Sequence, residues 1–124
     1  MGNITKNISR HELACNCGCG FDSMDYETIE VVQECCDHFA EKLGLSKVVL
    51  MISSAARCFE YNRSIGSNDN SQHPLARAMD ITIKHVSPAD VYAYLDTKYP
   101  GKYGMGNYPT FTHIDTRSGS AKRW

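Results

Sequence analysis

The sequence lacks a strong charge of either sign and lacks a long hydrophobic run. Its 124 residues include 13 Lys and Arg and 14 Asp and Glu, which gives a formal net charge of −1. A near-neutral chain has no basic stripe to release counterions from a phosphate backbone, so nucleic acid is excluded as a partner. The longest aliphatic run, 48–52, is far shorter than the ~20 residues that cross a bilayer, so no membrane span is expected.

The N-terminus has no apolar signal segment. Lys6 also stands where a myristoylation motif requires Ser or Thr. We therefore expect synthesis in the cytoplasm without a signal peptide. With 42% hydrophobic and 22% charged residues the composition is that of a globular protein. The length predicts one domain over 1–124 with a loop-rich lead-in at 1–22, and a monomer is expected.

Cysteine, by contrast, is abundant. Three of the six cysteines stand in the run Cys15-Asn16-Cys17-Gly18-Cys19-Gly20. This spacing differs from that of common zinc knuckles, and disulfides are not the default in a chain without a signal peptide. Three interpretations are open: buried thiols, a structural metal, or a disulfide from this run to Cys58 or to the Cys35-Cys36 pair.

Hydrophobic periodicity predicts the main elements. Apolar residues recur at helical spacing over 24–43, and Gly44 supplies a stop. A second helix begins at Ser87 and Pro88 and ends at 99–101. Strands are predicted at 47–53 and 78–83, a hairpin at 103–116 and a long loop at 59–76. Because these elements do not alternate regularly, the predicted class is α+β, with a small antiparallel sheet and two main helices on one face.

Two alternating strands place groups of metal-ligand type on the other face of that sheet. If their aliphatic residues face the core, Asp80, His113 and Asp115 point away from it, beside a loop that contains His73. No Lys or Arg occupies these strand positions, so the groups would repel one another without a cation. Two histidines and an aspartate suit a catalytic zinc with an open position for water. The alternative is an ordinary hydrogen-bonded histidine and an Asp80 that caps a turn or pairs with Arg77.

These residues also resemble a known family. Residues 71–80 are similar to the S-x-H-x-x-G-x-A-x-D signature of the M15 zinc peptidases, the D-Ala-D-Ala carboxypeptidase and endolysin group. Residues 111–115 resemble the family's second metal-binding strand, and 53–62 resemble its S-G-x-R-x-x-x-x-N segment. The lead-in 13–20 is similar to that of the short single-domain branch, so the resemblance covers nearly the whole chain.

The resemblance implies a role for each matching residue. The zinc ligands would be His73, Asp80 and His113. Arg57 would steady the scissile carbonyl oxygen or a substrate carboxylate, with a surface arginine as the alternative. Ser71 would contact the substrate, or else would hold the His73 loop.

The sequence departs from the family pattern at two places. Thr110 and Phe111 stand where many members have the catalytic base. Asp115 is then the nearest catalytic candidate, either as acid and base or as a partner that orients His113, and His85 is a more distant one. The second departure is Ala76 in place of Gly, which would cost roughly 1 kcal/mol if the backbone φ is positive there.

As a whole, the resemblance implies a zinc metallopeptidase that hydrolyses the peptide stems of bacterial peptidoglycan. It would be a D,D- or L,D-carboxypeptidase or an endopeptidase, and it would act at the cell wall through phage-type release. One alternative is a wall-binding or virion structural module that keeps the zinc site but has lost turnover. Another is a cysteine-rich metal protein built on 15–19.

Overall fold

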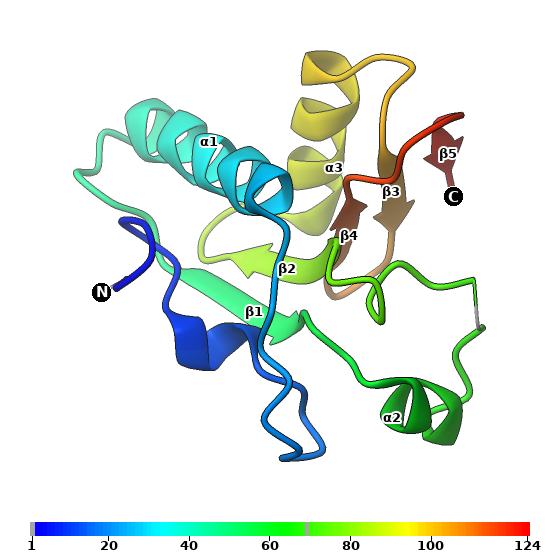
Figure 1. The fold of residues 1–124 in the computed structure, drawn as a ribbon. Coiled ribbons are helices and arrows are strands. Elements are labelled where there is room, and N and C mark those ends of the chain that lie inside the picture. Colours follow the sequence, from blue (N-terminus) through cyan, green and yellow to red (C-terminus); the bar gives the residue numbers. More distant parts are fainter. Residues whose placement is uncertain (1, 69) are drawn as a thin grey trace.

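The computed structural model describes residues 2–68 and 70–124 and confirms the α+β class (Figure 1). One sheet has the strand order β1-β2-β4-β3-β5. Its strands are β1 (Leu50–Ser54), β2 (Ala78–Ile83), β3 (Gly104–Asn107), β4 (Thr112–Asp115) and β5 (Lys122–Arg123). The sheet is antiparallel, as expected, except that β5 pairs parallel to β3.

Helices α1 (Tyr26–Leu43) and α3 (Pro88–Lys98) pack on the same side of the sheet, as Figure 1 shows. The Asp25 side chain caps α1 by accepting a hydrogen bond from the Glu27 backbone N–H at 3.1 Å. Ser87 caps α3 in the same way, through the N–H of Asp90 at 3.1 Å. None of the helices in the described part of the chain is both long and apolar enough to cross a membrane.

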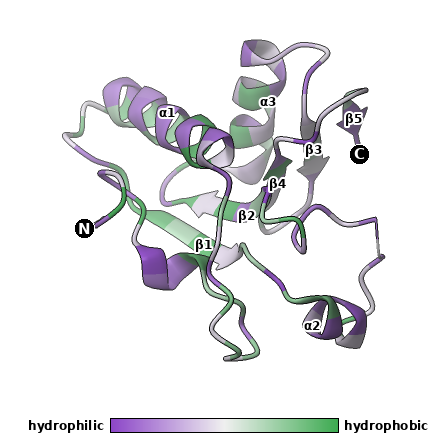
Figure 2. Ribbon diagram, viewed as in Figure 1, coloured by the Kyte–Doolittle hydropathy of each residue, from purple (hydrophilic) through white to green (hydrophobic). Residues whose placement is uncertain are grey.

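The register of β2 and β4 separates an apolar face from a polar one. Met79 pairs with Ile114, and both side chains are fully buried against the helices. The next pair, Asp80 and His113, therefore projects from the opposite face. The hydropathy colours of Figure 2 show the matching pattern on α1, where hydrophobic and hydrophilic residues occupy different sides.

The predicted loop at 59–76 contains a helix, which is a correction to the sequence analysis. Helix α2 (Phe59–Ser64) lies apart from the two longer helices, beyond the end of β1 (Figure 1). It has six residues, of which Asn62 is buried, so it presents no apolar stripe that periodicity could detect. A short 3-10 helix, η1 (Arg10–Leu13), interrupts the N-terminal lead-in.

Candidate metal centre

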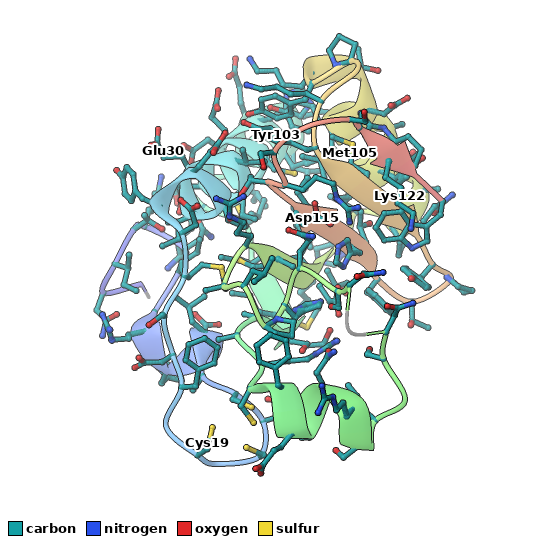
Figure 3. The ribbon with its side chains drawn as sticks, turned by 45° about the vertical axis from the view of Figure 1, so that its right-hand side comes forward. Cys19, Glu30, Tyr103, Met105, Asp115 and Lys122 are labelled. Atoms are coloured by element: carbon teal, nitrogen blue, oxygen red, sulfur yellow. The ribbon has the colours of Figure 1, made fainter. Side chains whose placement is uncertain are left out.

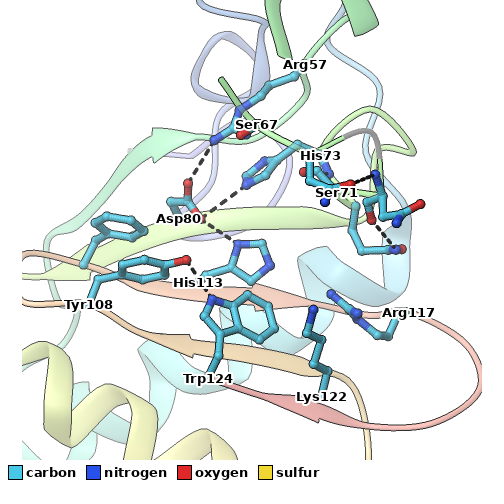
Figure 4. A pocket seen from close by; sticks show the side chains of 14 residues that line it. Arg57, Ser67, Ser71, His73, Asp80, Tyr108, His113, Arg117, Lys122 and Trp124 are labelled. Atoms are coloured by element: carbon cyan, nitrogen blue, oxygen red, sulfur yellow. Dashed lines mark hydrogen bonds and ion pairs between the residues drawn. The ribbon is translucent and has the colours of Figure 1, made fainter. Parts of the chain in front are cut away.

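Three side chains from separate segments converge on the polar face of the sheet. Asp80 lies in the middle of β2, His113 lies opposite it on β4, and His73 comes from the loop before β2. Asp80 Oδ1 is 2.9 Å from His113 Nδ1 and 3.3 Å from His73 Nε2 (Figure 4). All three ligand atoms lie within 4.8 Å of one another, and all three residues are buried.

The outer nitrogen of each imidazole is held by an acceptor. His73 Nδ1 is 2.6 Å from the carbonyl oxygen of Ala55, and His113 Nε2 is 2.7 Å from Asp115 Oδ2. Since a carbonyl or carboxylate oxygen only accepts, both outer nitrogens donate. The inner nitrogens both face Asp80 Oδ1, where a proton shared with the carboxylate takes the place that a metal ion would occupy. Once that proton is lost, two imidazole lone pairs and a carboxylate oxygen are directed at one point, so the donor set fits a divalent metal ion.

The electrostatics keep the carboxylates ionised. Burial opposes the charge of Asp80, but the neighbouring His113 and His73 outweigh it and hold the pKa of Asp80 well below its usual range. Burial likewise opposes ionisation of Asp115, and hydrogen bonds from Arg117 and His113 outweigh it, so the pKa of Asp115 is also lowered. Both groups are therefore anionic near neutral pH, the form in which a carboxylate binds a cation.

Arg57 lies beside Asp80 and is almost completely buried, at 8% exposure. Its Nη2 is 3.3 Å from Asp80 Oδ2. The other guanidinium nitrogens donate to Ser54 Oγ at 2.9 Å, and to Asn62 Oδ1 and Ser67 Oγ at 3.1 Å each. These contacts fix the orientation of the guanidinium at the edge of the centre.

Asp115 lies behind His113, away from the open side of the centre. It has no solvent exposure. Arg117 donates to both of its oxygens at 2.7 Å, through Nε to Oδ1 and through Nη2 to Oδ2. The structure therefore brings Asp115 to His113, as period two predicted, but not to the pocket in front of the candidate metal ligands.

A pocket of about 400 Å³ opens in front of the three ligands (Figure 4). The lining is polar, with cationic and aromatic side chains around it. Its members are Arg57, Ser67, Asn68, Asn70, Ser71, Gln72, His73, Asp80, Tyr108, Phe111, His113, Arg117, Lys122 and Trp124.

Two proposed site residues occupy different positions relative to this pocket. Ser71 is part of the lining, and its hydroxyl accepts the His73 backbone N–H at 3.3 Å. It is thus placed both to contact a ligand and to hold the His73 loop. His85 lies in the exposed turn after β2 and is not part of the lining.

Sequence reasoning missed a group of aromatic and cationic residues at the pocket rim. Trp124 Nε1 donates to the Tyr108 hydroxyl at 2.7 Å, and Tyr108 stacks on Phe111 with ring centroids 4.4 Å apart. Lys122 lies 5.3 Å from the Trp124 ring. The parallel β3–β5 pairing brings Lys122 and Trp124 to the rim. Lys122 shows no periodicity or ligand motif that would have indicated this position.

The comparison with known protein families supports a metal centre at these residues. The family model described as Peptidase M15 matches residues 6–115, a range that includes the three candidate ligands and Asp115. A search of the curated proteins finds no match. M15 peptidases are metal-dependent, and the buried His-Asp-His set supplies a suitable donor group. Because the match spans most of the chain, this protein belongs to the M15 peptidase family and is a hydrolase of the metallopeptidase type.

Proposed function

We propose that this protein is a zinc-dependent peptidase that hydrolyses the peptide stems of bacterial peptidoglycan. The proposal rests on one observation: two imidazole nitrogens and a carboxylate oxygen, each fixed from behind, converge at the base of a pocket. Two His and one Asp are nitrogen and oxygen ligands of the kind that zinc takes in catalytic sites with an open position. The ligands would be His73, Asp80 and His113.

Bound zinc supplies Lewis-acid polarisation of a carbonyl group and lowers the pKa of a water molecule. The chain's own residues determine where that chemistry occurs. The Ala55 carbonyl and Asp115 hold the outer nitrogens of His73 and His113, so each imidazole has one inner nitrogen for the metal. We propose that Asp115 acts by orienting His113, since its carboxylate is buried and bound by Arg117.

Arg57 is suited to stabilise negative charge on the substrate. A guanidinium has five N–H donors. Ser54, Asn62, Ser67 and Asp80 accept four of these hydrogen bonds. The remaining Nη2 proton can bind the scissile carbonyl oxygen, on which charge develops in the transition state, or a substrate carboxylate.

The rim of the pocket favours a peptide with a free carboxylate. Arg117 is neutralised by Asp115, whereas Lys122 forms no ion pair with any carboxylate in residues 2–68 and 70–124. We infer that Lys122 binds a substrate carboxylate, which favours a carboxypeptidase over an endopeptidase. Stem peptides with free and amidated C-termini test this. Lys122→Gln should raise KM for the free acid several-fold, and equal cleavage of both peptides by the wild type would indicate an endopeptidase.

A second candidate function is a wall-binding module that holds zinc without turnover. The pocket lining favours this function. Among the described residues that line the pocket, Asp80 is the one carboxylate, and as a metal ligand it leaves no second carboxylate there to act as an acid or base. Incubation of the metal-loaded protein with purified peptidoglycan separates the two functions. A peptidase releases soluble fragments and stops releasing them with a chelator. A binding module sediments with the wall and releases none.

A further inference from the structure

A second group of metal-ligand side chains lies outside the pocket. Sequence analysis left its cysteines open between thiols, a disulfide and a metal. In the structure Cys15 Sγ is 3.4 Å from Cys17 Sγ and 3.9 Å from Cys58 Sγ. Cys17 Sγ and Cys58 Sγ are 3.7 Å apart, and Cys19 completes a set whose sulfur atoms all lie within 4.8 Å.

The three separations among Cys15, Cys17 and Cys58 match the edges of one face of a tetrahedron. At the usual Zn–S distance of about 2.3 Å, two sulfurs of a tetrahedral site are about 3.8 Å apart. Thiolates on different irons of an iron–sulfur cluster would lie farther apart than those on a single ion. All six cysteines are free in the structure, and Cys35 and Cys36 are buried in α1 away from this group.

The local backbone builds the cluster. Gly18, with a φ of 84°, turns the lead-in loop between the second and third cysteine. Cys58 is the N-cap residue of α2, and its sulfur accepts the Tyr61 N–H at 3.4 Å. The Cys58 N–H in turn donates to Cys15 Sγ at 3.4 Å. Such N–H donors stabilise a sulfur that carries negative charge, as a metal-bound thiolate does.

We propose a second, structural zinc site formed by four thiolates, those of Cys15, Cys17, Cys19 and Cys58. A metal at this position would connect two segments that are distant in sequence. Figure 3 shows Cys19 on the loop at the end of the molecule opposite Tyr103. The cluster joins this loop to residues 55–58, which also contact the catalytic centre.

The segment 55–58 contacts both sites. The carbonyl of Ala55 holds His73 Nδ1 at 2.6 Å, and Arg57 reaches Asp80 at 3.3 Å. Cys58 then belongs to the thiol cluster. The same end of β1 is tied to the lead-in by the Ala56 N–H, which donates to the Leu13 carbonyl at 3.0 Å. A metal in the cluster would therefore fix the strand end that positions Arg57 and the His73 imidazole.

Metal counting on the folded chain of 124 residues tests the proposal. The wild type, purified under reducing conditions, should contain two zinc ions, and the Cys17→Ser/Cys19→Ser variant should contain one. His113→Ala should also contain one, but at the thiolate site. Cys36→Ala is the matched control and should keep two, because Cys36 is a core thiol outside the cluster.

Cobalt substitution provides a second readout that does not depend on activity. The wild type and His113→Ala should both show the intense near-ultraviolet thiolate-to-cobalt absorption, and the double cysteine variant should lose it. If that variant fails to fold, a mercurial thiol reagent added to the wild type should release one zinc and leave the other bound. Equal zinc content in the wild type and a folded double variant, no thiolate-to-cobalt absorption in the wild type, or disulfides among these four residues in the metal-loaded protein would overturn the proposal.

Discussion

Asp115 Oδ2 accepts a hydrogen bond from His113 Nε2 at 2.7 Å, and both residues lie on the same face of β4. The contact is buried, and Arg117 also donates a hydrogen bond to Asp115 Oδ2. The spacing of two residues left Asp115 open as an acid and base or as a partner that orients His113, and the structure places its carboxylate behind the imidazole. In that position it fixes the ring and directs Nδ1 toward Asp80.

Asp115→Asn should weaken zinc binding at the His-Asp-His centre about 10- to 100-fold, because it removes the charge that orients and polarises His113. Activity should largely return at saturating zinc. Zinc affinity from a metal-buffered titration and kcat at saturating metal separate the two effects. Asp96→Asn removes an exposed carboxylate that binds Arg123 and should change neither value. Unchanged zinc affinity with a large loss of kcat would instead assign Asp115 the acid–base role.

Arg57→Lys should lower kcat about 100- to 1000-fold, the usual effect of losing one preorganised donor to a developing oxyanion. Lysine keeps the charge but loses the planar fork that contacts Ser54, Asn62 and Ser67. Arg10→Lys, at the exposed ion pair with Asp22, is the control and should be as active as the wild type. Steady-state kinetics on a stem peptide measure this effect, and near wild-type kcat for Arg57→Lys would rule out the proposed role.

Ala76→Gly should stabilise the protein by about 0.5 to 1 kcal/mol. Ala76 has a φ of 58°, in the left-handed region that disfavours residues with a Cβ. Its turn connects the His73 loop to β2. Ala89→Gly in the exposed first turn of α3 is the same substitution with the opposite expected sign, a loss of about 0.5 to 1 kcal/mol. Urea unfolding of both variants checks the pair, and destabilisation by Ala76→Gly would contradict the reported strain.

Tyr103 should make folding stability fall at alkaline pH. Burial, and then the hydrogen bond that its hydroxyl donates to Glu27 Oε2, raise its pKa from 10.0 to about 12. The unfolded chain loses this proton first as pH rises, so the stabilisation is complete below pH 10 and about 1 kcal/mol is lost by about pH 11. Unfolding free energies for the wild type and Tyr103→Phe, compared at about pH 9 and about pH 11, measure the difference. An equal fall in unfolding free energy between these two pH values in both proteins would contradict the assignment to Tyr103.

The sequence was sufficient where side-chain period and local caps determine the structure. Alternation predicted 78–83, the bounds of β2, and the Ser87-Pro88 pair predicted the start of α3. Period two also predicted that Asp80 and His113 share a face, because the register aligns them as partners. Helix α2 was missed because six largely polar residues capped by Cys58 have no apolar repeat.

The parts of the site that escaped prediction depend on contacts between distant segments. The sequence left Cys58 and the Cys35-Cys36 pair equally open as partners of the cysteine run, and only the fold brings Cys58 to Cys15, across 43 positions of sequence. Lys122 reaches the pocket only through the parallel β3–β5 pairing, which no local pattern specifies. The position of Asp115 behind His113 depends on Arg117, whose guanidinium binds both carboxylate oxygens.

We propose that the His-Asp-His centre binds the metal ion on which hydrolysis of the peptide stems depends. The most direct measurement is fragment release from purified peptidoglycan by metal-stripped protein as zinc is added back. The wild type and His85→Asn should gain activity as the centre fills, since Asn tolerates the positive φ of this exposed turn, whereas His113→Ala should stay inactive. The same zinc-dependent release by His113→Ala, or no release by fully metal-loaded wild type, would contradict the account.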